Sequence, residues 1–281
     1  MFANVRALFD RWRGFFGVSV LVLLFVAGVQ LFVLSEHTDV YFSWAIQLPL
    51  TAAFLGAGYW AALFAIYFVS RDKTGASART SALPSALATT LMSITSFLYF
   101  DKFSWNSPHA ITVFLTWVWF LVYVFGPLFL IAAWIIQMRS PRVDSSEPRP
   151  LPAWTRGGFF VLAALFLLTG IGLFAVPDAV VAFWPWKIGA FAGRAISAWL
   201  VAYGSACGLV AKENDRVAGA GTMWSLAAFS VLQFIAIARY PATLNWSNPF
   251  AWVYVIALLA GLVFNAAALW STRRTAAGGN G

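Results

Sequence analysis

The chain is short of charge. Of its 281 residues only 10% are Asp, Glu, Lys or Arg, whereas 61% are hydrophobic and 18% are aromatic. A water-soluble domain of this length needs far more polar surface to cover such an apolar interior. The composition therefore excludes an ordinary soluble fold and predicts that lipid surrounds most of the chain.

Cysteine and histidine are also scarce. Cys207 is the only cysteine, so no disulfide can form within the chain, and its apolar surroundings predict a small core side chain. His37 and His109 are the only histidines, and we expect both near the outer surface rather than within facing spans, where axial haem ligands would lie. The sequence therefore predicts no cofactor and no metal site.

Acidic residues and catalytic motifs are missing from the apolar segments. All ten Asp and Glu residues fall in expected loops or at helix ends, whereas ion-coupled carriers commonly use ionisable groups near the bilayer midplane. A phosphate-binding glycine loop, a nucleophile elbow and a zinc-helix motif are absent from the sequence. These absences argue against an ion-coupled transporter and give no support for an enzyme.

The basic residues are present but dispersed. The net charge of +8 comes from 18 Lys and Arg residues, which stand in short clusters between apolar runs. This arrangement is typical of membrane loops. We therefore expect no nucleic-acid partner.

Long apolar runs are what the chain has in abundance. A helix needs about 20 apolar residues to cross the hydrocarbon, and eight runs come near that length. They are Phe15–Leu34, Leu48–Ser70, Leu83–Phe100, Ala110–Met138, Phe159–Val176, Gly189–Ala211, Ala218–Ala238 and Pro249–Ser271. The sequence predicts an all-α polytopic membrane protein with about eight transmembrane helices.

The distribution of basic residues predicts the orientation of these spans. If the N-terminus is cytoplasmic, only Lys102, Lys187, Arg194 and Arg239 of the 18 basic residues lie on the outer side. Basic loops resist translocation. We therefore expect a multi-pass protein of the bacterial inner membrane, or more generally of a cell membrane, with both termini in the cytoplasm.

The second half of the sequence resembles the first. Trp44-Ala45-Ile46 corresponds to Trp186-Lys187-Ile188, and Trp105-Asn106-Ser107-Pro108 corresponds to Trp246-Ser247-Asn248-Pro249. We interpret the chain as two tandem four-helix repeats, residues 1–145 and 146–281. Because each repeat has an even number of spans, both should point the same way across the membrane, related by an axis along its normal.

Two sets of residues are candidates for a site near the outer surface. Trp44, Trp105, Trp186 and Trp246 form symmetric pairs at expected helix ends, either as an aromatic belt or as the rim of a pocket for a lipid head group or quinone. The cations Lys102, Arg194 and Arg239 either extend to the interface or bind lipid phosphates, with a salt bridge from Arg194 to Asp178 as a further alternative.

Polar residues within the spans are the third set. Gln30 and several threonines more often join helices than line a substrate path. A central cavity lined by Thr89, Thr90, Ser93, Ser96, Gln233 and Asn265 would favour a transporter or channel between the two halves. A bundle filled by Phe and Trp would favour the function we expect, which is binding of membrane lipids or a hydrophobic small molecule, or packing against other membrane subunits.

Overall fold

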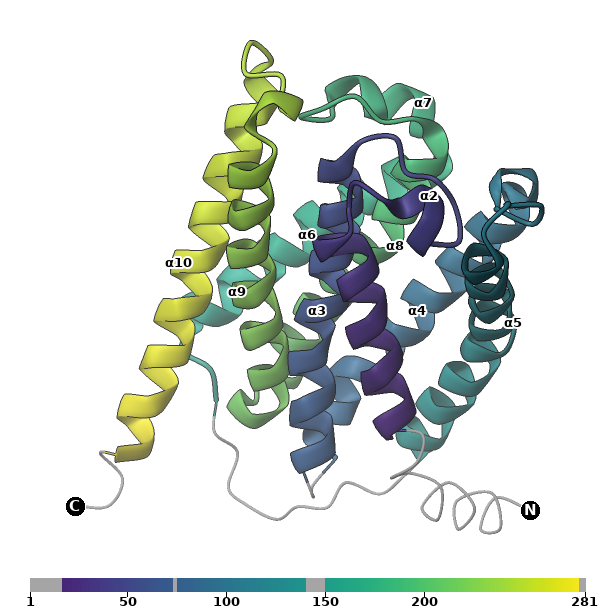
Figure 1. Cartoon of the computed structure of the whole chain (residues 1–281). Helices are drawn as coiled ribbons and strands as arrows, with labels where there is room; N and C mark the ends of the chain where they lie inside the picture. The colour runs from purple at the N-terminus through teal and green to yellow at the C-terminus, as the bar shows by residue number, and fades with distance from the viewer. Residues whose placement is uncertain (1–16, 73–74, 140–149, 278–281) are drawn as a thin grey trace.

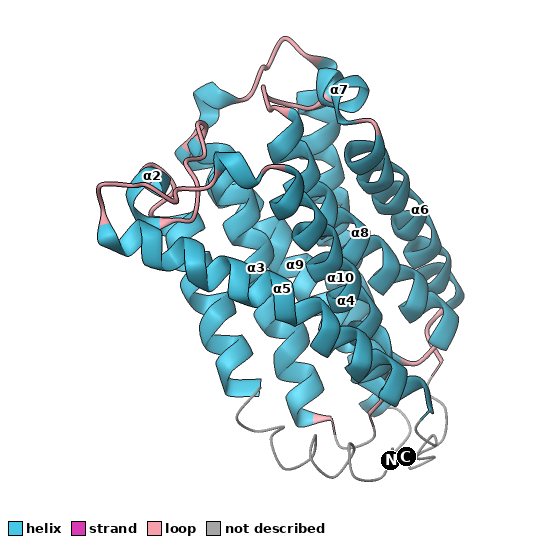
Figure 2. Cartoon of the chain, turned by 90° about the vertical axis from the view of Figure 1, so that its right-hand side faces the viewer, coloured by secondary structure: helices cyan, strands magenta, loops and turns pink. Residues whose placement is uncertain are grey.

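The computed structural model describes residues 17–72, 75–139 and 150–277, and within these ranges the chain consists of helices and loops without a strand (Figures 1 and 2). Among the described residues, seven helices are long and apolar enough to cross a membrane: α3 (Pro49–Arg71), α4 (Ala76–Leu98), α5 (Ala110–Arg139), α6 (Ala153–Ala175), α8 (Ala190–Glu213), α9 (Arg216–Arg239) and α10 (Pro249–Ala277). A shorter apolar helix, Gly17–Val33, precedes them and is called helix 1 here. The predicted fold class, a polytopic helical membrane protein, is confirmed.

Two helices begin earlier than the sequence predicted. The third span was expected from Leu83, but α4 begins at Ala76 and includes Pro84 in its interior. The fifth was expected from Phe159, but α6 begins at Ala153. In both cases the polar first turns extend the helix beyond the apolar run that the prediction relied on. The expected start at Phe15 and the repeat boundary at residues 145–146 lie outside the described residues.

The bundle has two distinct ends. At one end, called the short-helix end, lie α2 (Thr38–Tyr41), α7 (Pro177–Val180) and the single 3-10 turns η2 (Phe100–Lys102), η3 (Val181–Phe183) and η4 (Pro241–Thr243) (Figure 1). At the other, called the hairpin end, α3 leads to α4 and α8 leads to α9. The last turn of helix 1, η1 (Val29–Val33), is a π-helix that ends at the short-helix end.

The helices pack across the two halves of the chain. Helix α3 lies against α9 and α4 lies against α8, while α6 covers α8, α5 covers α4, α10 covers α9 and η1 contacts α3. The most apolar stretch of α8 is 72% buried, compared with 17% for α10. Outer helices expose large apolar side chains, as in Leu128, Leu168 and Ile256. This exterior is what a hydrocarbon solvent requires.

Each half contributes a buried tryptophan to the core of the other. The ring of Trp44, which precedes α3, lies 5.1 Å from Phe191 of α8. The indole of Trp186, which precedes α8, donates a hydrogen bond of 2.8 Å to the hydroxyl of Thr51 in α3. Both indoles are almost fully buried. The two halves are therefore interlocked in a common core.

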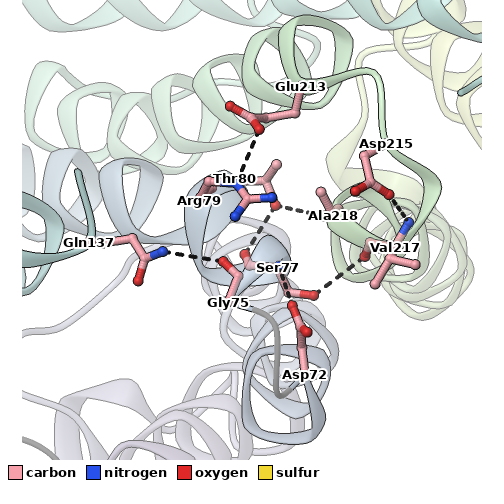
Figure 3. A network of polar contacts seen from close by, with 10 residues as sticks. All are labelled: Asp72, Gly75, Ser77, Arg79, Thr80, Gln137, Glu213, Asp215, Val217 and Ala218. Atoms are coloured by element: carbon pink, nitrogen blue, oxygen red, sulfur yellow. Dashed lines mark hydrogen bonds and ion pairs between the residues drawn. The ribbon is translucent and has the colours of Figure 1, made fainter. Parts of the chain in front are cut away.

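Polar contacts connect the two hairpins (Figure 3). The Thr80 hydroxyl of α4 donates to the carbonyl of Ala218 in α9 at 2.7 Å. The guanidinium of Arg79 in α4 pairs with the carboxylate of Glu213 at the end of α8 at 3.1 Å, and both side chains are largely buried. These bonds cross from one half to the other, so they fix the relative position of the halves at the hairpin end.

Candidate functional site

A groove runs along the bundle between helix 1 and α5. Its volume is about 540 Å³, within the range of about 300–1,000 Å³ that ligand pockets occupy. The part of α5 that lines it extends from Leu115 to Leu130, which at 1.5 Å per residue is about 22 Å of helix. The groove is thus elongated and covers much of the roughly 30 Å thickness of a hydrocarbon layer.

The walls of the groove are almost entirely apolar. Helix 1 and α5 contribute Val20, Leu23, Leu24, Val26, Leu121, Val122, Phe125, Phe129 and Leu130, among others. Charged side chains are absent from the described residues that line it. Such a surface suits a hydrocarbon chain and cannot compensate a buried charge.

Aromatic side chains, among them Tyr59, Tyr123 and Trp199, form the inner wall. The hydroxyls of Tyr59 in α3 and Tyr123 in α5 share a hydrogen bond of 2.6 Å. The Tyr59 ring lies 4.9 Å from the ring of Trp199 in α8. A Cβ atom on Gly58 would come within 2.7 Å of the same indole, so glycine is needed for α3 to approach α8 here. The inner wall therefore joins α3, α5 and α8 through direct side-chain contacts.

Gly126 leaves space in the groove. It lies on α5 among the lining residues, and a Cβ atom built there meets nothing within 4 Å. The next residue, Pro127, has no N–H to donate to the carbonyl of Tyr123 one turn earlier. The sequence Gly-Pro in the middle of α5 therefore both opens the groove and interrupts the hydrogen bonding of its wall.

Gln30 and Thr89 are polar side chains of the groove with different surroundings. Thr89 donates its hydroxyl to carbonyls of its own helix, including that of Ser85 at 2.9 Å. The side-chain amide of Gln30, in the π-helical turn of helix 1, makes no hydrogen bond to the described part of the chain. π-Helical turns occur frequently at functional sites. Gln30 is the amide of this groove whose polar atoms are left for an occupant, and the indole N–H of Trp199, on the inner wall, is also without a partner in the described chain.

The opposite side of the bundle is closed by an aromatic ring. Phe264 of α10 lies 5.2 Å from the ring of Phe159 in α6. A Cβ atom on Gly158 would come within 2.2 Å of Phe264, so the contact between the helices is tight. The space between α6 and α10 is therefore occupied by protein at this level.

The two candidate arginines bind the ends of neighbouring helices. Arg194 of α8 donates to the carbonyl of Phe174 at the end of α6 at 3.0 Å and to the hydroxyl of Tyr99. It forms no ion pair with Asp178 within the described chain. Helix C-termini carry carbonyls without helical partners and a partial negative charge, which a guanidinium satisfies.

Arg239 of α9 does the same for helix 1. It donates to the carbonyl of Phe32, to that of Val33 at 3.3 Å and to the hydroxyls of Ser35 and Tyr240, the latter at 2.9 Å. Each guanidinium thus joins a phenylalanine carbonyl in one half to a tyrosine hydroxyl in the other. Their use in anion binding stays a prediction.

The remaining outer candidates lie apart from the groove. The indoles of Trp105 and Trp246 donate to the carbonyls of Phe100 and Pro241, at 2.9 and 2.8 Å, and close the turns that follow α4 and α9. Lys102 is exposed and lies 2.9 Å from the carboxylate of Asp101, and this hydrogen bond lowers the pKa of Asp101. With Trp44 and Trp186 buried, the four tryptophans do not surround a common pocket.

The predicted cavity residues are dispersed, and of the six only Thr89 lines the groove. Thr90 and Ser96 donate to carbonyls of their own helix, and Ser93 is half-buried on α4. The Gln233 amide donates to the carbonyl of Phe54 at 3.2 Å and accepts from the Tyr254 hydroxyl at 2.9 Å, while Asn265 donates to the carbonyl of Gly261. Gln233 thus joins α9 to α3 and α10.

Sequence reasoning missed the groove. Gln30 was noticed only as one of several polar residues within spans, and Gly126 was not singled out. The signal available was the pair Gly126-Pro127 in the longest apolar run, together with an amide in an otherwise apolar first span. Neither shows which helices lie opposite.

Comparisons of the chain with protein families, with curated proteins and with solved structures found no match. Within the ranges that the structure describes, no group of three or more His, Cys, Asp or Glu residues is placed to hold a metal ion. The groove is therefore the feature of the molecule that points to a function.

Proposed function

We propose that this membrane protein binds a lipid chain or a hydrophobic small molecule in the groove between helix 1 and α5. The observation that carries the proposal is the groove itself, which is about 540 Å³ in volume, elongated, apolar and free of charge among its described lining residues. In a membrane such a space is in contact with acyl chains, so a ligand can enter from the bilayer without crossing water.

The packing between the halves favours binding over transport. The Phe54 ring of α3 lies 5.3 Å from that of Phe229 in α9, which in turn lies 5.1 Å from Tyr203 of α8. The polar residues that a transport path would need are dispersed, and three of them, Thr89, Thr90 and Ser96, donate to carbonyls of their own helix. A transporter or channel between the halves is therefore the less supported alternative.

The test fills the groove without disturbing the fold. Gly126→Leu places a side chain in empty space, and Gly157→Leu, on the exposed face of α6, is the matched control because a Cβ atom there also meets nothing within 4 Å. Both changes should leave the helices intact, since leucine is the better helix former. Native mass spectrometry of the proteins released gently from their membrane measures the retained lipid.

We expect Gly126→Leu to lose most of the retained lipid and Gly157→Leu to keep it. Equal retention in both variants and in the parent chain would show that the groove is not the binding site. Retention of a protein subunit, abolished by neither change, would favour the packing role instead.

We further propose that the hairpin end faces the cytoplasm of a bacterial cell. The excess of Lys and Arg at that end supports it. Because the single Cys207 is buried, introduced cysteines can be labelled selectively. His109→Cys at the short-helix end should react with a membrane-impermeant maleimide in intact cells, whereas the exposed Lys212→Cys should react only after lysis, and the reverse result would invert the topology.

The tandem duplication is also a proposal, and paired contacts support it. The backbone N–H of Ser104 donates to the Ser43 carbonyl at 3.0 Å, and that of Asn245 donates to the Pro185 carbonyl at 3.2 Å. The tryptophan that follows each donor closes the same turn. On this basis residues 1–145 and 146–281 are two copies of one unit that share a core.

A further inference from the structure

The inference concerns Gln30 and the kind of ligand that the groove accepts. An amide carries two N–H donors and a carbonyl acceptor. Gln30 is half-buried on the groove wall, and none of these groups is bonded within the described part of the chain. Polar groups without partners are strongly disfavoured at membrane depth, where water cannot compensate them. The amide therefore calls for a polar group of the occupant.

The described groove lining around Gln30 offers no counter-charge to an ionised group. The described lining residues of the groove include no Lys, Arg, Asp, Glu or His. The nearest guanidinium along helix 1 is that of Arg239, and it donates to the Phe32 and Val33 carbonyls and to two hydroxyls. A buried ionised head group without a counter-charge would cost more than an amide can return.

The position of Gln30 along the groove indicates which way a bound ligand is oriented. Helix 1 ends at Val33, so Gln30 lies near the short-helix end of the groove. From there the lining continues past the Tyr59–Tyr123 pair, whose hydroxyls already bond to each other, to Leu130 toward the hairpin end. Hydroxyls of Ser81 and Ser85 in α4 also line the groove toward the hairpin end, so what distinguishes the end near Gln30 is its amide, which no other described lining residue carries.

We propose that the groove takes an uncharged lipid whose polar end carries a carbonyl oxygen, to which the Gln30 amide donates, with the chain extending toward the hairpin end. This inference rests on the proposed function and adds the class of ligand. A glycerolipid ester and an isoprenoid quinone share this chemistry. Both are therefore included as probes.

The experiment compares ligands that differ in their polar end. Mono-olein (an uncharged ester), oleate (a charged carboxylate) and octadecene (no polar group) share a similar chain, and decyl-ubiquinone supplies quinone carbonyls. Each probe is titrated into the delipidated full chain in detergent, and bound fractions are measured by native mass spectrometry. The variant is Gln30→Leu. The matched control is Thr89→Val, which removes a groove hydroxyl that is already bonded to its own helix.

For the parent chain and for Thr89→Val we expect mono-olein or decyl-ubiquinone to bind about tenfold more tightly than octadecene, the effect of one or two hydrogen bonds. Gln30→Leu should abolish this preference and still bind octadecene. The probe that binds more tightly identifies the source of the carbonyl.

Two outcomes would overturn the inference and leave the proposed function in place. One is equal binding of octadecene and both carbonyl probes by the parent chain, and the other is an unchanged preference in Gln30→Leu. Preferential binding of oleate would overturn it in favour of a charged head group. Failure of all four probes, together with unchanged lipid retention in Gly126→Leu, would instead refute the proposed function.

Discussion

Helix 1 and α6 are held at their ends in the same way but are covered differently along their length. Each ends in a phenylalanine carbonyl bound by an arginine that also contacts a tyrosine hydroxyl, Arg239 for helix 1 and Arg194 for α6. Beside α6, however, Phe264 fills the space toward α10, whereas beside helix 1 the groove stays open. The two helices are thus fixed similarly at their ends and differ along their length, where a groove lies open beside helix 1 and Phe264 closes the space beside α6.

The largest expected effect is the loss of the Phe264 ring beside α6, compared with the loss of a ring beside helix 1. Phe264→Ala should lower the free energy of unfolding by about 2–3 kcal/mol, because it leaves a cavity against α6. Phe125→Ala, on the exposed wall of the groove, should change it by less than about 0.5 kcal/mol. Reversible unfolding in mixed detergent measures both. Equal losses of unfolding free energy in the two variants would mean that the space beside α6 and the space beside helix 1 are packed alike.

Removal of Arg194 or Arg239 should have the next largest effect on the free energy of unfolding. The order of the two effects should not follow the number of hydrogen bonds that each arginine makes. Arg239 has more partners, but it is exposed, so water or lipid head groups can replace it. Arg194 is half-buried. We expect Arg194→Ala to cost about 2 kcal/mol and Arg239→Ala about 1 kcal/mol, consistent with hydrogen bonds to charged groups. A larger cost for Arg239→Ala would show that the number of contacts dominates.

The ion pair at the hairpin end takes one partner from each half of the chain. Because Arg79 and Glu213 come from different halves and are largely buried, a double-mutant cycle of Arg79→Ala and Glu213→Ala should give a coupling of about 1 kcal/mol. Salt should reduce it only slightly, since the pair is shielded from solvent. A coupling near zero would leave the hydrogen bond from the Thr80 hydroxyl to the Ala218 carbonyl as the main connection between the hairpins.

The smallest expected effect is the pH response of the loops at the short-helix end. The hydrogen bond from Lys102 lowers the pKa of Asp101 in η2, whereas the corresponding turn η4 has no acidic residue. A carboxylate whose pKa is lowered on folding contributes stability above its unfolded pKa, and that contribution disappears as the pH falls through the folded pKa. Asp101→Asn should remove this acid response without changing η4, as followed by NMR of the two loops.

The sequence predicted the membrane class and the positions of the long helices, because apolar length and flanking charge act locally. The exceptions were local too, since the polar starts of α4 and α6 lie outside the apolar runs. The groove could not be predicted. It depends on which helices lie side by side, and nothing in the sequence indicates that Trp199 of α8 lies behind Tyr59 of α3. Likewise, Arg194 and Arg239 were noticed as unusual cations, but their carbonyl partners come from distant segments.

The exchange of tryptophans between the halves has a consequence for biosynthesis. Helix α3 is complete at Arg71, but its main neighbour α9 begins only at Arg216. At 5–20 residues per second the ribosome needs roughly 7–30 s to make the intervening chain. During that time the newly inserted first half presents the surface of α3 around Gly58, which Trp199 of α8 later covers, and the unfilled site for Trp186 to the translocon and to surrounding lipid. If the two halves were encoded separately, each would expose the surface that the other half normally covers. They should therefore accumulate in the membrane only when both are made in the same cell.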